Sequence, residues 1–241
     1  MEKNKLELAV VIPVYNEKEI ISVVLKDWHQ TLDKLEINFE IHAYNDGSKD
    51  NSLKVMIEIS EHFDRLIVHD KSNSGHGPTI LKGYRENSDA EFIFQVDSDN
   101  EMRPDEFFKV WEFRNKADFI LGRRDRKVSP LVRRIMSWAS RTTVGLFYSD
   151  KVYDVNAPYR LMRSSIFKKY WQIIPEDTFA PNIIISGIAG FINSRIVELP
   201  IKHINRATGE VSIKKIKLLR VAIKSLFQTV GFRISLHRLG C

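Results

Sequence analysis

Two aspartates one residue apart, Asp97 and Asp99, directly follow an apolar run at residues 92–96. Carboxylates at the end of a buried strand can share one divalent cation. Hard ions such as Mg²⁺ and Mn²⁺ prefer oxygen ligands and keep positions open for the phosphates of a nucleotide. Glu101 is a candidate third ligand. Because acidic residues are also common in loops after strands, the pair predicts a metal site only with support from its surroundings.

The first half of the chain alternates strand and helix patterns. Strands are expected at 8–14, 39–44, 66–68, 92–96 and 119–121, and helices at 17–35, 50–62, 80–86 and 104–115. This alternation predicts an α/β fold with a mostly parallel sheet covered by helices on both faces. Ligands of such folds bind beyond the carboxyl ends of the strands.

The loops after the first four expected strands are rich in carboxylates, amides and glycines. They span 15–17, 45–50, 70–77 and 97–99. Glycines let backbone N–H groups approach a ligand closely, although Asn, Asp, Gly and Ser also dominate ordinary turns. One such loop fits either interpretation, whereas four at one edge of a sheet favour a nucleotide-phosphate site.

The chain of 241 residues carries a net charge of +6, and its excess cations gather at 123–141 and 214–238. Clustered cations indicate an anionic partner such as nucleic acid, a phosphorylated substrate or a membrane surface, although a solvated basic face also explains a single cluster. The one cysteine excludes an intrachain disulfide. Neither a signal peptide nor an apolar run of ~18 residues is evident, so we expect a cytoplasmic protein.

Together these residues resemble the inverting glycosyltransferase family 2, which has the Rossmann-like GT-A fold. The likeness covers residues 10–227. Its first-half motifs are V-I-P-V-Y-N-E at 11–17, N-D-G-S-K-D at 45–50, N-S-G-H-G at 73–77 and D-S-D at 97–99. Asn45 departs from the family pattern, which has Asp there, so its contact to the base is the least certain part of the match.

The resemblance implies that a nucleotide diphosphate sugar, with UDP or GDP, lies across the strand ends. Donor contacts are expected from Pro13, Tyr15, Glu17, Asn45, Asp46, Ser48, Asn73, Gly75, Gly77, Asp97 and Ser98. Asp97 and Asp99, with Glu101, would hold Mg²⁺ or Mn²⁺, which neutralises charge on the leaving nucleotide. The histidines show no ligand spacing, and only His76 lies where it could reach the phosphates.

The second half resembles the polyprenyl-phosphate branch of the family, which includes the dolichyl-phosphate mannose and glucose synthases. The matching pieces are L-G-R-R at 121–124, Arg133 with Ser137, D-V-N-A-P-Y-R at 154–160, E-L-P-I at 198–201, and Arg206, Gly209, Glu210 and Ser212. Pro158 stands where Gly is usual. The resemblance implies a lipid monophosphate acceptor held by Arg123, Arg133, Ser137, Arg206 and Ser212, with Asp99, Asp154 and the three arginines as catalytic residues. Arg133 facing solvent is the competing interpretation.

A hydroxyl acceptor is the main alternative, as in soluble relatives that extend glycans or lipid-linked glycans of surface polysaccharides. A hydroxyl needs a general base, whereas a phosphate is already ionised. Glu176-Asp177, before an expected helix at 178–189, fits a base region or a helix N-cap. Asp154 is another acid for this role.

We expect a catalytic domain at 1–212, divided into a nucleotide-sugar half (1–122) and an acceptor half (123–212), and a basic amphipathic helical extension at 213–241. In the acceptor half, helices are expected at 129–147 and 165–170, an irregular or extended piece at 154–163, and a strand at 196–201. The segment 216–232 is typical of a helix on anionic lipid or of one packed on the domain. The first of these interpretations leads to the hypothesis of peripheral binding to the inner face of a membrane.

Other classes of protein are less well supported. In a nucleic-acid-binding protein, Asp46, Asp97 and Asp99 would face a polyanion, so no nucleic-acid partner is expected. A dinucleotide oxidoreductase would carry its glycine-rich turn after the first strand, where this chain has Tyr15-Asn16-Glu17. The motifs fit a sugar-nucleotide-binding protein without turnover as well as an enzyme.

Overall fold

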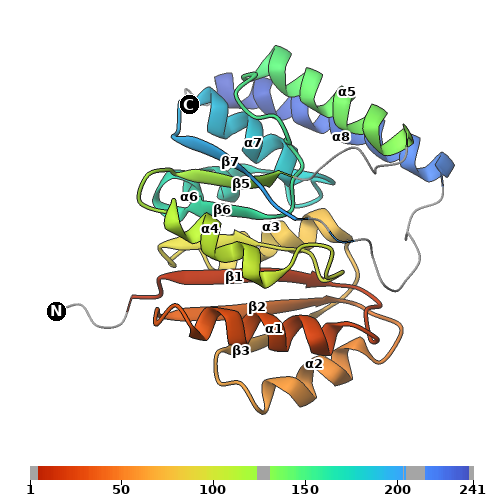
Figure 1. Ribbon diagram of the computed structural model, residues 1–241. Coiled ribbons are helices and arrows are strands. Elements are labelled where there is room, and N and C mark those ends of the chain that lie inside the picture. Colours follow the sequence, from red (N-terminus) through yellow and green to blue (C-terminus); the bar gives the residue numbers. More distant parts are fainter. Residues whose placement is uncertain (1–4, 124–130, 203, 205–214, 239–241) are drawn as a thin grey trace.

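A seven-stranded sheet forms the centre of the part of the chain that the structure, a computed structural model, describes: residues 5–123, 131–202, 204 and 215–238 (Figure 1). Its order is β3-β2-β1-β4-β6-β5-β7. The strands are β1 (Leu8–Val14), β2 (Phe39–Asp46), β3 (Leu66–Lys71), β4 (Phe92–Gln95), β5 (Phe119–Arg123), β6 (Arg160–Arg163) and β7 (Ile196–Pro200). Only β6 among these runs antiparallel to its neighbours, β4 and β5. The predicted α/β class with a mostly parallel sheet is confirmed.

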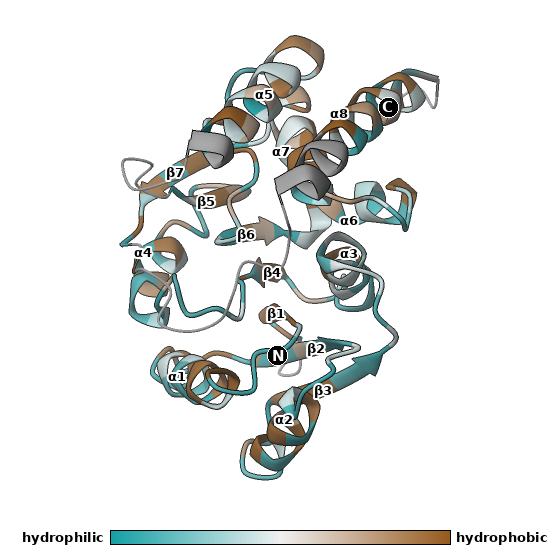
Figure 2. Ribbon diagram, turned by 90° about the vertical axis from the view of Figure 1, so that its right-hand side faces the viewer, coloured by the Kyte–Doolittle hydropathy of each residue, from teal (hydrophilic) through white to brown (hydrophobic). Residues whose placement is uncertain are grey.

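Helices cover both faces of the sheet (Figure 2). One face carries α1 (Ile21–Asp33), α2 (Ser52–Ser60) and α4 (Phe107–Glu112), which a short 3-10 turn at Pro104–Glu106 precedes. The other carries α3 (His76–Glu86), α6 (Ser164–Ile173) and α7 (Pro181–Phe191). Helices can pack on both faces because successive side chains of a strand point to opposite faces of the sheet. Along β1, Leu8, Val10 and Ile12 belong to one core, whereas Ala9 and Val11 belong to the other.

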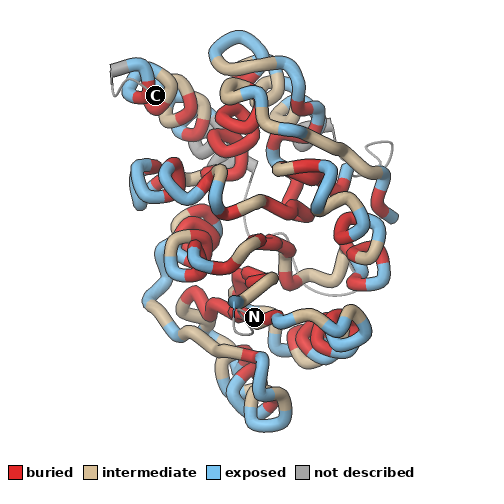
Figure 3. Tube along the Cα trace, turned by 90° about the vertical axis from the view of Figure 1, so that its left-hand side faces the viewer, coloured by how far each residue is buried: buried red, intermediate tan, exposed pale blue. Residues whose placement is uncertain are grey.

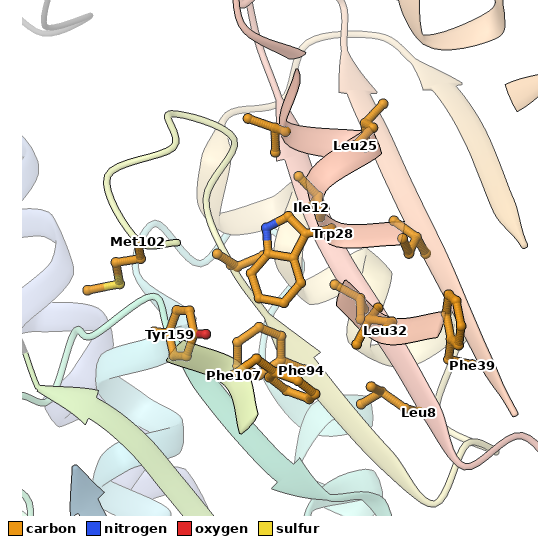
Figure 4. Packing of buried hydrophobic residues seen from close by; sticks show 14 of the residues in the cluster. Leu8, Ile12, Leu25, Trp28, Leu32, Phe39, Phe94, Met102, Phe107 and Tyr159 are labelled. Atoms are coloured by element: carbon orange, nitrogen blue, oxygen red, sulfur yellow. The ribbon is translucent and has the colours of Figure 1, made fainter. Parts of the chain in front are cut away.

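Trp28 of α1 is the centre of the first core (Figure 4). Its ring is 1% exposed, and its centroid lies 5.3 Å from that of Phe94 and 5.8 Å from that of Phe107. Tyr159 completes the cluster at 6.0 Å. Because Phe94 belongs to β4, this packing holds α1 against the strand that leads to Asp97. The central strands of the sheet are buried along most of their length (Figure 3).

The helices α5 (Leu131–Phe147) and α8 (Lys215–Arg238) lie side by side beyond the second face of the sheet (Figure 1). Tyr148 Oη donates a hydrogen bond to the carbonyl of Thr229 at 2.7 Å, and Phe232 and Leu236 of α8 are buried in the second core. The described part of the C-terminal helix is therefore packed on the domain. The domain boundary at residue 212 lies outside the described residues and stays a prediction.

Several element boundaries differ from expectation, among them that of α3, which begins at His76 rather than at 80. Two other observations about the elements have clear physical reasons. α7 begins at Pro181 rather than 178, because the residue before a proline is disfavoured in helical geometry and proline suits the first helical turn. The piece at 154–163, expected to be irregular or extended, is a strand from Arg160 to Arg163, where it inserts between β4 and β5. Within this piece, residues 160–162 are the ones that pair with both neighbouring strands.

Candidate functional site

The carboxyl ends of β1, β2, β3 and β4 meet at one edge of the sheet, because these four strands are parallel neighbours. The loops that follow them are bonded to one another. Asn16 N donates to Ser48 Oγ at 3.0 Å, and Lys49 N donates to Asn16 Oδ1 at 2.7 Å. Glu17 N donates to Ser52 Oγ at 2.8 Å. The structure therefore brings the predicted donor residues of the first two loops together.

Asp46 organises the glycine-rich loop. Its carboxylate accepts hydrogen bonds from Ser74 N at 2.8 Å and Gly75 N at 2.9 Å, and pairs with the ammonium of Lys71. Asn73 Nδ2 donates to the Asp46 carbonyl at 2.7 Å. Burial alone would raise the pKa of Asp46, but Lys71 and the N–H of Ser74 hold it below its usual value. The buried carboxylate of Asp46 thus holds this loop in place. The sequence analysis did not identify Lys71 as the partner of Asp46.

Asn45 is buried beside Asp46 and its side chain is used inside the protein. Its Nδ2 donates to Asp70 Oδ1 at 2.7 Å, and its Oδ1 accepts from Ser48 N at 3.2 Å. An amide can make both bonds, whereas a carboxylate would place two negative charges in contact. Asn45, at a position where the family pattern has Asp, therefore suits a neighbour that is itself an acid, Asp70.

We expect the Asn45→Asp variant to lose about 1–3 kcal/mol in free energy of unfolding at pH 7, because it sets a buried carboxylate against Asp70. Urea denaturation would measure the loss. Adding Asp70→Asn should restore most of the stability, since an amide then faces the new carboxylate. Equal stability of Asn45→Asp and the parent protein would contradict this account.

The glycine-rich loop leads into the N-terminus of α3. Gly75 has φ +96°, a conformation that favours glycine, and precedes His76, the first residue of the helix. A Cβ on Gly77 would lie 2.1 Å from the carbonyl oxygen of Phe179, so Gly77 permits the 178–179 backbone to pack on α3. Free N–H groups at a helix N-terminus favour anions such as phosphate.

His76 joins the helix N-terminus to the aspartate pair. Its Nε2 lies 3.0 Å from Asp97 Oδ1, and about half of its side chain is exposed. Partial loss of water around the ring works to lower the pKa of His76, but the carboxylates of Asp97, Asp99 and Asp46 together outweigh this effect and raise the pKa. Sequence reasoning placed His76 within reach of phosphates, and the structure places it directly on Asp97.

The Asp97–Asp99 segment begins two residues after the end of β4. Gln95 Nε2 donates to Asp97 Oδ1 at 2.9 Å, and Glu101 N donates to Asp99 Oδ1 at 3.1 Å. Among the described residues, no three His, Cys, Asp or Glu side chains gather as a complete metal site. Mg²⁺ is usually held by one or two carboxylates together with substrate phosphates, so the oxygen donors of this pair fit such a cation. Glu101 as a third ligand stays a prediction.

Of the predicted acceptor residues, Arg123 is the one whose side-chain contact the structure describes in most detail. Arg123 ends β5, and its guanidinium carbon lies 5.7 Å from the ring centroid of Tyr153, while that of Arg141 lies 4.0 Å from the same ring. Asp154, next in the chain, is 2% exposed. The sequence analysis did not single out Arg141, because its link to Arg123 passes through the ring of Tyr153.

The remaining predicted acceptor residues are only partly described. Ser137 lies half-buried on α5. Arg133 lies on the same helix, but its side chain is outside the described part of the structure. Arg206 and Ser212 fall outside the described residues altogether. Their roles stay predictions.

Glu176 and Asp177 line a cleft along α3 that also contains Lys71, Ser74, Pro78 and Leu81. Both acids are exposed: Glu176 pairs with Arg85 at 3.2 Å, and Asp177 with Lys224 at 3.4 Å. The N-cap of α7 is Ala180, without a side-chain bond, so the N-cap interpretation of Asp177 is wrong. Pro181 sets the start of the helix too far along the chain for Asp177 to reach it.

The model of glycosyl transferase family 2 matches residues 9–171 of this chain. The chain therefore belongs to that family, and its sheet with helices on both faces is the GT-A fold predicted from the sequence.

Known proteins resemble the chain over most of its length. It is 28% identical over 221 residues to the undecaprenyl-phosphate 4-deoxy-4-formamido-L-arabinose transferase of Edwardsiella ictaluri, covering 89% of this chain and 65% of that protein. The chain thus spans about two thirds of that relative's length.

Solved structures share the fold at low identity. Mannosyl-3-phosphoglycerate synthase from Rubrobacter xylanophilus has a TM-score of 0.66 at 13% identity, covering 98% of this chain and 75% of that one. Glucosyl-3-phosphoglycerate synthase from Mycobacterium tuberculosis, solved with Mn²⁺ and uridine-diphosphate-glucose, has a TM-score of 0.62 at 17% identity, covering 94% and 79%. No helix within the described residues is long and apolar enough to cross a bilayer.

Proposed function

We propose that this chain transfers a sugar, with inversion, from a nucleotide diphosphate sugar to a polyprenyl phosphate, with a divalent cation at Asp97 and Asp99. The observation that carries the proposal is the contact between His76 and Asp97, at 3.0 Å. This contact sets the N-terminus of α3, a kind of position that favours anions, beside a carboxylate pair at the edge where the family resemblance implies donor binding. Named relatives that act on undecaprenyl phosphate support the acceptor class.

On the donor side, the chain's own groups suit a diphosphate. α3 begins at His76, whose side chain reaches Asp97, so the N-terminus of this helix lies beside the edge that carries the aspartate pair. Asp46 and Lys71 keep the preceding loop in place before the donor binds. A cation held by Asp97 and Asp99 would neutralise the charge that develops on the leaving diphosphate.

On the acceptor side, Arg123 and Arg141 flank Tyr153 and offer guanidinium groups that fit phosphate oxygens. An ionised phosphate oxygen attacks the anomeric carbon from the side opposite the nucleotide. The new carbon–oxygen bond forms while the bond to the diphosphate breaks, and its electron pair leaves with the diphosphate. No strong base is required, because the attacking phosphate carries no proton to remove.

We also propose that α5 and α8 bring the chain to the cytoplasmic face of an anionic membrane, where a polyprenyl phosphate resides. Trp138, Leu146 and Phe227 on these helices are 66%, 77% and 75% exposed. Apolar residues are visible along both helices (Figure 2), and exposed Arg134 and Lys224 accompany them. Exposed apolar side chains among cations are typical of a surface that lies on anionic lipid.

The test of the transfer activity is an assay with Mn²⁺ or Mg²⁺, a panel of UDP- and GDP-sugars, and a short-chain polyprenyl phosphate. Release of the nucleoside diphosphate together with an acid-labile lipid-linked sugar is the expected result. Turnover of the donor without a lipid product would refute the phosphate acceptor and favour a hydroxyl. Glu176 and Asp177, which line the cleft along α3, would then be replaced by their amides.

Co-sedimentation with anionic vesicles tests the membrane proposal. The Trp138→Ser, Phe227→Ser double variant should lose most of its binding at low salt, since it removes two exposed apolar anchors. Ile57→Ser is the matched control, because Ile57 is 46% exposed on α2, at the other end of the molecule (Figure 1). Binding of the double variant equal to that of the control would refute this surface.

A further inference from the structure

A chain of buried hydrogen bonds joins α3 and α7 to the carboxylate of Asp97. Tyr84 Oη donates to Asn182 Oδ1 at 2.9 Å, and Asn182 Nδ2 donates to Gln95 Oε1 at 2.8 Å. Gln95 Nε2 then donates to Asp97 Oδ1 at 2.9 Å. Tyr84 and Gln95 are fully buried, and Asn182 is 3% exposed. Burying polar groups in a core costs free energy unless each of them is hydrogen-bonded, so the local fold depends on this series of hydrogen bonds.

The elements hold each member in place. Ile93 and Gln95 on β4, and Asp97 beyond it, are two residues apart and therefore share the face covered by α3 and α7. Asn182 is the second residue of α7, directly after Pro181. Its backbone carbonyl accepts a hydrogen bond from Arg160 Nη1 at 3.0 Å, so Asn182 is held through both its backbone and its side chain.

The donor and acceptor directions along this series of hydrogen bonds follow from the carboxylate of Asp97 at its end. A carboxylate only accepts hydrogen bonds, so Gln95 must turn its NH₂ group toward Asp97 and its carbonyl oxygen toward Asn182. Asn182 then has to present its own NH₂ group, and its oxygen accepts from Tyr84. Tyr84 Oη also lies 3.3 Å from Gln95 Oε1, but its single hydrogen is used in the shorter bond to Asn182 Oδ1. Asn182 therefore supplies the short hydrogen bond, at 2.8 Å, that keeps the oxygen of the Gln95 amide turned away from Asp97.

We propose that Asn182 is a positioning residue for Asp97: it locks the amide of Gln95 in the orientation that holds the Asp97 carboxylate for a divalent cation. This inference rests on the proposed function, in which Asp97 is a cation ligand. It assigns a role in the donor site to a helix of the acceptor half, 85 residues further along the chain. Hydrogen bonds to a ligating carboxylate typically change metal affinity by about 10–100-fold.

The test measures Mn²⁺ binding in the presence of UDP, by the loss of the free Mn²⁺ signal in electron paramagnetic resonance, without turnover. Gln95→Met should weaken Mn²⁺ binding by about tenfold. Asn182→Leu should do the same when it is made in a Tyr84→Phe background and compared with Tyr84→Phe alone, because Tyr84 Oη is the other donor near Gln95 Oε1. The Gln95→Met, Asn182→Leu double variant should bind no more weakly than Gln95→Met alone, because no amide then remains for Asn182 to orient. A merely structural role would instead give additive losses.

Asn87→Leu is the matched control, since Asn87 is also a buried amide, bonded to Tyr44 Oη at 3.0 Å and away from Asp97. Its stability loss should resemble that of Asn182→Leu, while its Mn²⁺ affinity stays within about twofold of the parent. Folded variants of Asn182 and Gln95 that bind Mn²⁺ like the parent would overturn the proposal. If Asn182→Leu does not fold, Asn182→Ala, which removes the same amide without adding bulk, is measured in its place. A parent protein that binds no Mn²⁺ would refute the proposed cation site itself, which is a separate outcome.

Discussion

The Asp99→Ala variant is expected to lose at least about 10²-fold in kcat/KM for sugar transfer, with little change in stability. Asp99 is partly exposed beyond the end of β4, so its removal leaves the buried core unchanged. Removal of one group that stabilises a developing charge commonly lowers the rate by about 10²–10³-fold. Asp99 is proposed to hold the cation that stabilises the leaving diphosphate, so its loss should weaken the whole effect of that cation.

The measurement is steady-state transfer with saturating Mn²⁺, together with thermal unfolding of each variant. Asp105→Ala is the control, because Asp105 is an exposed acid shortly after Asp99 in the chain and is not part of the proposed site. We expect Asp105→Ala to retain activity within about twofold, as surface substitutions usually do. Retention of most activity by Asp99→Ala would refute the assignment of this carboxylate.

The Gly77→Ala variant is expected to be destabilised by about 1–3 kcal/mol or more and to bind UDP more weakly. The added Cβ would meet the carbonyl oxygens of Phe179 and Thr178 at 2.1 and 2.5 Å, and backbone cannot yield as a flexible side chain can. The start of α3 must then move away from the 178–179 segment, and it carries the N–H groups proposed to face the diphosphate. The expected loss in UDP affinity therefore accompanies the loss in stability.

Gly231→Ala provides the comparison, because Gly231 lies within α8 and a Cβ there meets no atom within 4 Å. Alanine is the better helix former by about 1 kcal/mol, so this variant should be equally or more stable. Urea denaturation and UDP titration of both variants would test the pair. A Gly77→Ala variant as stable as Gly231→Ala would show that the close approach to Phe179 is not required.

The family and the edge of the sheet at which the polar loops gather were predictable because they depend on short, local signals. β1 has the bounds that the apolar run predicted, since a strand buried on both faces carries an uninterrupted hydrophobic stretch. The loops after the first four strands could be placed at one edge because parallel strands share a direction. Asp97 and Asp99 were found as a pair from their spacing alone.

The contacts that give these residues their surroundings were not predictable. Lys71 beside Asp46, Arg141 on Tyr153 and Asn182 on Gln95 join residues that no sequence period relates. The insertion of β6 between β4 and β5 brings Arg160, and with it α7, over Gln95. The chain by itself determined the strands, the family and the carboxylate pair, because local patterns encode them. Only the tertiary structure decided which buried polar groups hold that pair, because hydrogen-bond partners are chosen by packing in space and not by separation along the chain.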